Sequence, residues 1–142
     1  MPTQKAEAEW KGNLVQGSGR LKVGSGAFDG PYSFKSRFEE GQSATNPEEL
    51  IGAAHAGCFT MALSLILGEA KLTATHMETT AEVTLDKVAD GFAITAVHLT
   101  LKAKVPGADQ AKFEELAAKA KAGCPVSKLL NAKITLDATL VE

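Results

Sequence analysis

The sequence predicts an α+β fold with mostly antiparallel sheets, because strand-like and helical segments come in runs and not in strict alternation. Three segments with the two-residue period of a strand precede a long apolar helical segment, and two more follow it. A second helix, a short helical turn and a last strand complete the order. We expect one domain over residues 1–142, a length that can bury a hydrophobic core.

The first three strands are expected at the N-terminal end. Residues 8–23 form a predicted hairpin, in which apolar and polar residues alternate on both sides of the Gly17-Ser18-Gly19 turn. A glycine-containing loop over residues 26–31 leads to a third strand over residues 32–38, whose aromatic side chains share one face. Arg37 is expected on the opposite face of that strand.

A long helix is expected to begin after Asn46, which can cap it, and to end at Gly68. Pro47 suits the first helical position, and Glu49 lies three residues after the cap, as a capping box requires. Residues 50–67 are apolar or small nearly all round and are few for a bilayer span, which predicts a buried core helix. One thin set of strands covers such a helix only in part, so we expect a homodimer.

The second half of the chain is predicted to add three strands and two helical segments. Asp109 can cap a helix that carries an apolar stripe and ends at Gly123, and residues 124–130 form a short helical turn. A turn at Asp90-Gly91 makes two neighbouring strands an antiparallel pair. The expected strands are, in order, residues 77–88, 92–105 and 134–140.

Composition and charge exclude several classes of function. The net charge is -2 with both signs interleaved, so the chain lacks a basic stripe for nucleic acid or for an anionic membrane surface. Residues 1–10 carry Lys5, Glu7 and Glu9 in place of the apolar segment of a secretory signal, so we expect a cytoplasmic protein. In that compartment cysteines are reduced at rest, and a disulfide between them would be transient and part of the chemistry.

Cys58 is the first candidate for chemistry. It lies about ten residues inside the long helix, beyond the first turn where the helix dipole lowers the pKa of a thiol. Alone it would be a small buried hydrophobe, which is the usual role of a free cysteine. Glu48 and His55 fall within one helical sector of about 80° with Cys58, and Glu48 lies roughly 15 Å from it along the axis.

Arg37 is the candidate that can link Glu48 to the thiol. It is one of two arginines, with Arg20, and lies on the segment that leads into the helix. A guanidinium can hold a carboxylate with one edge and stabilise a thiolate and then a peroxide oxygen with the other. The plain alternatives are that Glu48 is an acid in the first helical turn, where the helix dipole favours it, and that Arg37 is a solvated residue at the end of a strand. His55 is left out of the catalytic set, because a core histidine bonded to a carbonyl is the simpler interpretation.

Cys124 is the second candidate, because it lies between Gly123 and Pro125, where one helix ends and another begins. Its sulfur is therefore expected near a helix N-terminus and on a junction that can move. The 65 residues between it and Cys58 exclude a local C-x-x-C redox pair. The alternative role is a helix cap with a silent thiol.

Other chemistries lack a local signature. The isolated His55, His76 and His98 and two distant cysteines do not have the spacing that preorganises a metal site, so no metal is expected. The sequence has no Walker loop, G-x-G-x-x-G or G-x-S-x-G, which disfavours a nucleotide-dependent enzyme and a serine hydrolase. We therefore expect no cofactor.

Residues 45–59, TNPEELIGAAHAGCF, resemble the core motif of the OsmC/Ohr family, the osmotically inducible protein C and organic hydroperoxide resistance proteins. The resemblance continues through residues 79–81, 85–88 and 91–95, and into the second cysteine motif, residues 119–127, and residues 134–137. It covers nearly the whole chain and is greatest toward the OsmC branch.

The resemblance implies a thiol-dependent peroxidase that reduces organic hydroperoxides, and hydrogen peroxide more weakly, in defence against oxidative or osmotic stress. By it, Cys58 is the peroxidatic cysteine, Cys124 the resolving cysteine, Arg37 the activating arginine and Glu48 the acid that holds it. It also implies an intertwined α+β homodimer with active sites at the subunit interface. A dithiol, such as a dihydrolipoyl protein, is the implied reductant.

Two other classes of function stay open on the sequence. One is a non-enzymatic dimeric stress protein that binds an apolar ligand, in which the cysteines are incidental. The other is a structural disulfide protein, which the missing secretory signal disfavours.

Overall fold

The computed structural model describes residues 2–142, so Met1 of the expected domain lies outside the described residues. The chain divides into two compact units, Met1–Leu50 and Ile51–Glu142, and each is described by itself. Runs of strands and helices confirm the α+β class, and the single domain stays a prediction. The elements are, in order, β1 (Ala6–Lys11), β2 (Ser18–Val23), β3 (Asp29–Tyr32), α1 (Phe34–Phe38), α2 (Pro47–Glu69), β4 (His76–Val88), β5 (Gly91–Lys104), α3 (Gln110–Gly123), α4 (Pro125–Leu129) and β6 (Lys133–Val141).

The first unit holds an antiparallel sheet in the order β1-β2-β3, which confirms the predicted hairpin. Its turn covers residues 12–17 and not the predicted Gly17-Ser18-Gly19, because Ser18 and Gly19 belong to β2. Trp10 of β1 lies opposite Gly19 of β2, and Gly19 lies opposite Tyr32 of β3. The rings of Trp10 and Tyr32 meet edge to face, with their centroids 5.5 Å apart. A Cβ at Gly19 would collide with both rings, so this glycine lets the two aromatic side chains close over the strand.

The predictions of a loop over residues 26–31 and a strand over residues 32–38 are wrong in position. The third strand, β3, already begins at Asp29 and ends at Tyr32, and residues 34–38 form the short helix α1. Ser33 begins this helix by accepting a hydrogen bond from the backbone N–H of Ser36 at 3.0 Å. The Ser36 hydroxyl in turn accepts from the backbone N–H of Ser33 at 2.8 Å, which completes a capping box built from two serines. These two caps outweigh the alternation of aromatic residues that predicted a strand.

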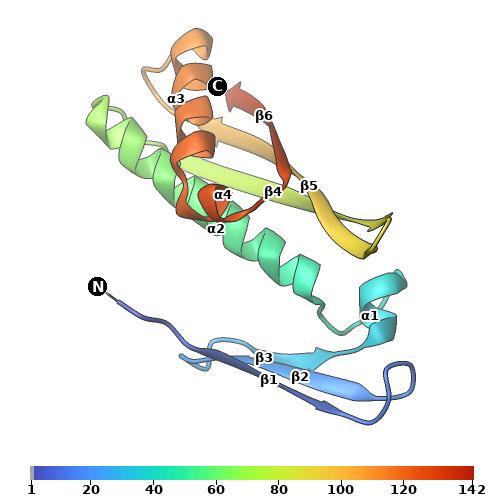
Figure 1. Cartoon of the computed structure of the whole chain (residues 1–142). Coiled ribbons are helices and arrows are strands. Elements are labelled where there is room, and N and C mark those ends of the chain that lie inside the picture. Colours follow the sequence, from blue (N-terminus) through green and yellow to red (C-terminus); the bar gives the residue numbers. More distant parts are fainter. Residues whose placement is uncertain (1) are drawn as a thin grey trace. The chain divides into compact units, whose positions relative to one another are not determined.

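The second unit holds a sheet in the order β4-β5-β6. β4 and β5 pair antiparallel as predicted, whereas β6 runs parallel to β5, so this sheet is mixed. Alternate residues of β5 are buried on one face, and α2 and α3 lie along one side of the sheet in Figure 1. The buried residues of β5 are Val97, Leu99, Leu101 and Ala103.

Helix α2 begins and ends close to the predicted residues. The side chain of Asn46 accepts a hydrogen bond from the backbone N–H of Glu49 at 2.7 Å, which confirms the predicted cap. Only one face of the helix is buried in the single chain, while Met61 and Leu65 are 76% and 66% exposed. Among the described residues, α2 is the one helix long and apolar enough to cross a membrane, a test that a core helix of a soluble protein also passes.

The core of the second unit joins one face of α2 to the sheet and to α3. Phe59, Leu63 and Leu67 recur at four-residue intervals on α2 and are at most 1% exposed. They form one cluster with the buried residues of β5 and with the apolar stripe of α3, which includes Phe113. Cys124 is a fully buried member of this cluster, so the core fixes the position of the second cysteine.

His55 is a buried polar residue that ties α2 to α4. Its side chain is fully buried, and Nε2 lies 2.8 Å from the hydroxyl of Ser127. The sequence predicted a backbone carbonyl as the hydrogen-bond partner of His55, and the structure has the Ser127 hydroxyl in its place. Burial lowers the pKa of His55, because the charged imidazolium would lose its hydration.

Replacing Leu63 by alanine is expected to destabilise the chain by about 2–5 kcal/mol, because the vacated core volume cannot refill completely. Leu14, which is 62% exposed, supplies the matched leucine-to-alanine control and is expected to change stability by about 0.5 kcal/mol or less. Urea unfolding measures both differences. Equal losses in the two variants would contradict the placement of Leu63 in the core.

The buried His55 is expected to make stability depend on pH. Its pKa is lowered in the folded chain, so as the pH falls below about 6.5 the unfolded chain binds more protons than the folded chain. The free energy of unfolding therefore keeps its full contribution from neutral His55 above this pH and decreases as the pH falls below it. His55→Gln should flatten this part of the curve of unfolding free energy against pH. The exposed His76 is the control, and His76→Gln should leave the slope as in the unmodified chain.

Candidate active site

Cys58 and Cys124 come together in the second unit. Cys58 is half-buried on α2, and Cys124 is buried at the junction where α3 ends and α4 begins. The backbone N–H of Cys124 donates to the Ala120 carbonyl at 2.9 Å, and its carbonyl accepts from the Lys128 N–H at 3.1 Å. Both cysteines are free thiols, and their side chains interact so that each shifts the pKa of the other. Two cysteines that are separated by 65 residues in sequence thus form a thiol pair in the fold.

The pKa values of the two thiols are shifted in opposite directions. Burial raises the pKa of Cys58, and the hydrogen bond and the charge at Cys124 raise it further, against a smaller opposing effect of the Val126 backbone N–H. Burial also acts to raise the pKa of Cys124, but hydrogen bonds from the Cys58 thiol and from Ser127 outweigh it. The result is a lowered pKa for Cys124. Within the described unit the proton therefore favours Cys58, and the thiolate favours Cys124.

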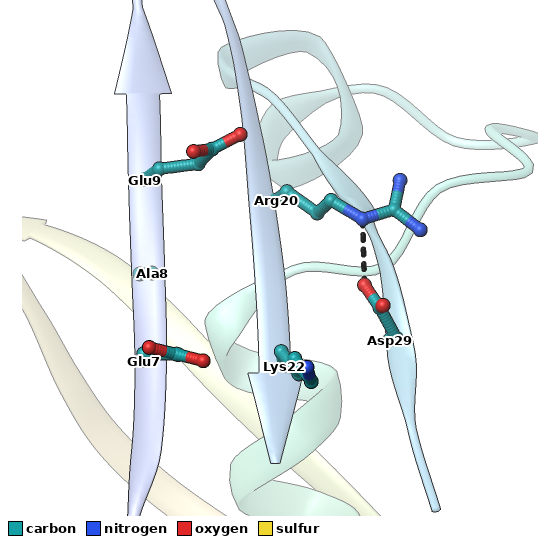
Figure 2. A pocket seen from close by; sticks show the side chains of 6 residues that line it. All are labelled: Glu7, Ala8, Glu9, Arg20, Lys22 and Asp29. Carbon is teal, nitrogen blue, oxygen red and sulfur yellow. Dashed lines mark hydrogen bonds and ion pairs between the residues drawn. The ribbon is translucent and has the colours of Figure 1, made fainter. Parts of the chain in front are cut away.

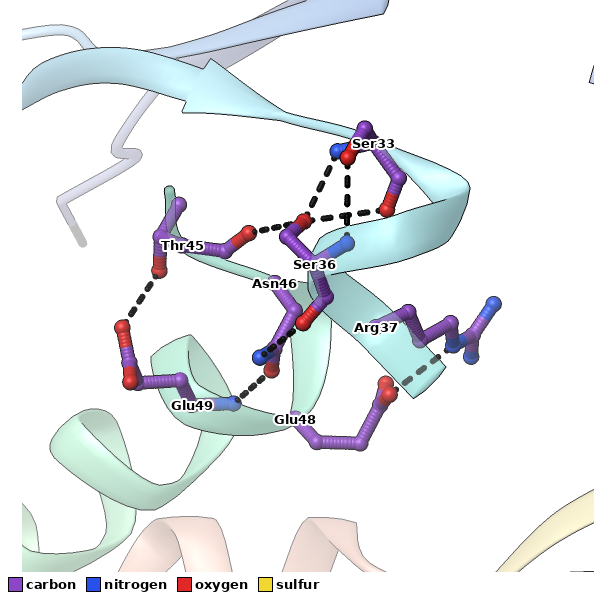
Figure 3. A network of polar contacts seen from close by, with 7 residues as sticks. All are labelled: Ser33, Ser36, Arg37, Thr45, Asn46, Glu48 and Glu49. Carbon is purple, nitrogen blue, oxygen red and sulfur yellow. Dashed lines mark hydrogen bonds and ion pairs between the residues drawn. The ribbon is translucent and has the colours of Figure 1, made fainter. Parts of the chain in front are cut away.

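Arg37 and Glu48 form an ion pair in the first unit. Nε of Arg37 lies 2.8 Å from Oε1 of Glu48, and the Glu48 side chain is only 11% exposed. The second carboxylate oxygen of Glu48 is buried without a hydrogen-bond partner among the described residues. The contact uses Nε, so the two terminal nitrogens of Arg37 point away from Glu48 in Figure 3. These nitrogens can donate hydrogen bonds to a second anionic group.

A network of neutral side chains positions the helix that carries Arg37 (Figure 3). The Ser36 hydroxyl donates to the Thr45 carbonyl at 2.7 Å, and Asn46 Nδ2 donates to the Ser36 carbonyl at 3.0 Å. The Thr45 hydroxyl donates to the Glu49 carboxylate at 2.9 Å. These bonds fasten α1 to the first turn of α2, which sets Arg37 beside Glu48.

Arg20, the other arginine, forms an ion pair with Asp29 on the sheet of the first unit. Its Nε lies 2.6 Å from Oδ1 of Asp29, and both side chains line an open hollow of about 270 Å³ with Glu7, Glu9 and Lys22 (Figure 2). This hollow carries charges of both signs and no thiol. Arg20 is therefore a poorer candidate than Arg37 for assisting Cys58.

The structure brings the predicted site residues together as two pairs, one in each unit. The catalytic roles of Cys58, Cys124, Arg37 and Glu48 stay predictions. Sequence reasoning missed Ser127, and its position three residues after Cys124, at the start of a helix, was the available signal. It also missed the serine cap of α1, which the spacing of Ser33 and Ser36 could have revealed. Among residues 2–142 no group of three histidine, cysteine or acidic side chains could hold a metal ion.

Comparisons with known proteins place the chain in a family. The family model described as OsmC-like protein matches residues 40–139. Peroxiredoxin OsmC of Escherichia coli is 55% identical over 135 residues, which are 94% of each chain. The organic hydroperoxide resistance protein OhrA of Bacillus subtilis is 33% identical over 103 residues, 71% of this chain and 70% of that protein.

Solved structures of the same family have the same fold. An organic hydroperoxide resistance protein from Elizabethkingia anophelis superposes with a TM-score of 0.78 at 26% identity, covering 99% of this chain and 98% of that one. An OsmC-like protein of unknown function from Vibrio cholerae superposes with a TM-score of 0.79 at 16% identity, covering 97% and 99%. The matched family model and the sequence identity to the curated relatives agree with this likeness. The chain belongs to the OsmC-like protein family.

Proposed function

We propose that this protein is a thiol-dependent peroxidase that reduces organic hydroperoxides through Cys58 and Cys124. The names of its relatives, a peroxiredoxin and organic hydroperoxide resistance proteins, support a peroxidase-type role. The observation that carries the finer proposal is the pair of free thiols, one half-buried and one fully buried, each of which shifts the pKa of the other. Two thiols that interact in this way can be joined by a disulfide when their sulfurs approach to bonding distance.

The first step is the attack of the Cys58 thiolate on the distal oxygen of the hydroperoxide. The attack requires a negative charge on Cys58 and a proton on Cys124. In this proposal the terminal nitrogens of Arg37, which Glu48 holds through Nε, supply the positive charge that favours the Cys58 thiolate. The O–O bond breaks, Cys58 becomes a sulfenic acid, and the alkoxide takes the proton of Cys124 to leave as an alcohol.

The second step follows from the first, because the loss of that proton leaves Cys124 as a thiolate. Its sulfur attacks the sulfur of the Cys58 sulfenic acid, the S–S bond forms, and the S–O bond breaks to release hydroxide, which solvent protonates. An external dithiol, such as a dihydrolipoyl protein, then reduces the disulfide and is itself oxidised to a disulfide. The cycle restores both thiols.

The apolar surroundings of Cys58 favour organic hydroperoxides over hydrogen peroxide. Cys58 packs against the core cluster of the second unit, and burial of an organic group contributes roughly 25 cal/mol per Å² of apolar area. Hydrogen peroxide has no such group. The physiological role we assign is defence against oxidative or osmotic stress in the cytoplasm.

A homodimer is part of the proposal. Met61 and Leu65 lie on the face of α2 that the single chain leaves exposed, and a second copy would cover them. An interface at this face also accounts for a helix that is apolar nearly all round. Arg37 of either subunit could then serve the thiol pair.

The proposed function is tested by steady-state consumption of hydroperoxide with a small dithiol as reductant. The unmodified chain should consume cumene hydroperoxide with a higher kcat/KM than hydrogen peroxide, and Cys58→Ser should abolish both activities. Consumption that survives in Cys58→Ser would reject the peroxidatic role of this residue. Equal kcat/KM values for the two peroxides would reject the apolar binding argument.

Removing the charge of Glu48 should slow the same reaction. Glu48→Gln loses a charged hydrogen bond, worth about 1.5–3 kcal/mol, and so should lower kcat/KM on the order of tenfold or more through a less ordered Arg37. The matched control is Glu49→Gln, because the Glu49 carboxylate accepts from Thr45 and not from Arg37. The role of the ion pair is contradicted when both variants lose the same activity or neither loses any.

A further inference from the structure

The guanidinium of Arg37 has a second neighbour besides Glu48, the aromatic ring of Phe38. Cζ of Arg37 lies 5.9 Å from the centroid of that ring, which is within the range of a cation–π interaction. The Phe34 ring lies 4.8 Å from the Phe38 ring, centroid to centroid, at an interplanar angle of 44°. Phe34 and Phe38 are the first and last residues of α1, four positions apart, so they share one face of the helix. The guanidinium therefore contacts a ring that a second ring supports.

The contact with Glu48 sets which edge of the guanidinium faces the carboxylate. It is a single hydrogen bond from Nε to Oε1, and Oε2 of Glu48 has no hydrogen-bond partner among the described residues. A bidentate pair would also hold the plane of the guanidinium, because two parallel bonds prevent it from turning about either one. Here the ring of Phe38 supplies that second constraint, since the attraction requires the cation to lie over the ring face.

Burial accounts for only part of the position of Phe38. The residue is 41% exposed, so it gains less from the hydrophobic effect than a phenylalanine in the core. The Arg37 side chain is 38% exposed, so water weakens its attraction to the ring, and we expect an effect in the lower part of the cation–π range. An effect of this size can still change how often the guanidinium has one orientation.

We propose that Phe38 is a positioning residue that holds the plane of the Arg37 guanidinium, so that its terminal nitrogens stay available to the peroxidatic thiolate and the peroxide. Those nitrogens point away from Glu48 in Figure 3. The proposal rests on the proposed function, because it assigns Phe38 to the group that stabilises the reacting charge. In this role Phe38 acts through Arg37 and takes no part in the making or breaking of bonds.

The first test measures the guanidinium itself and needs no peroxidase reaction. The chain has two arginines, so a nitrogen-15 spectrum of their Nε–H groups has two signals, which Arg20→Lys assigns. Phe38→Leu should raise the rate at which the Arg37 Nε–H exchanges with water about threefold, because a less ordered guanidinium leaves Glu48 more often. Phe38→Tyr keeps an aromatic ring and should restore slow exchange. Arg20, whose Nε lies 2.6 Å from Asp29, is the internal control and should not change.

The second test changes the charge distribution of the ring and nearly keeps its shape. Phenylalanines that carry one, two or three fluorine atoms are placed at position 38, where each fluorine weakens the negative face of the ring. The kcat/KM for cumene hydroperoxide should fall with each fluorine, to about a third of its starting value for three. The same replacements at Phe92, a phenylalanine that is 57% exposed, are the matched control and should leave kcat/KM unchanged.

The two tests separate the role of Phe38 from the proposed function. Unchanged Arg37 exchange in folded Phe38→Leu overturns the proposal, as does a kcat/KM that stays constant with fluorination at position 38 or falls equally at position 92. When Phe38→Leu does not fold by circular dichroism, the fluorinated chains give the exchange measurement in its place. A failure of the proposed function appears separately, as an unmodified chain that consumes no hydroperoxide.

Discussion

The interaction between the thiols of Cys58 and Cys124 is the one on which the site depends. Burial penalises charge on both sulfurs and so opposes a second negative charge in the pair, while the interaction between the thiols raises the pKa of Cys58 and lowers that of Cys124. The core places one sulfur on α2 and the other at the start of α4, and Ser127 and the nearby backbone stabilise the charge on the second.

The ion pair of Arg37 and Glu48 has a different kind of support. Uncharged hydroxyl and amide groups from residues 33–46 hold the short helix α1 to the first turn of α2, and the carboxylate is nearly buried. Because Glu48 engages Nε, the planar guanidinium keeps a fixed orientation with its terminal nitrogens directed elsewhere. A lysine in place of Arg37 would have one nitrogen for both tasks.

Local signals in the sequence predicted most of the helices and strands, and also the elements on which the two cysteines lie. Asn46 and Asp109 cap helices as expected, with 2.7 Å bonds to the backbone N–H groups of Glu49 and Lys112, because a cap depends on neighbouring residues alone. The parallel placement of β6 and the contact between the two thiols depend on packing over long sequence distances, which periodicity does not encode. At residues 34–38 two competing local signals were present, and the serine cap of Ser33 outweighed the aromatic alternation.

The most direct test of the account is to add one equivalent of cumene hydroperoxide to the reduced chain and to count free thiols while recording the intact mass. The account predicts that both thiols disappear into an intramolecular disulfide, and that Cys124→Ser instead retains an oxygen on Cys58 that a sulfenic-acid reagent traps. Thiols that survive excess hydroperoxide in the unmodified chain would contradict the peroxidase mechanism and return the apolar surface of α2 to consideration as a ligand site.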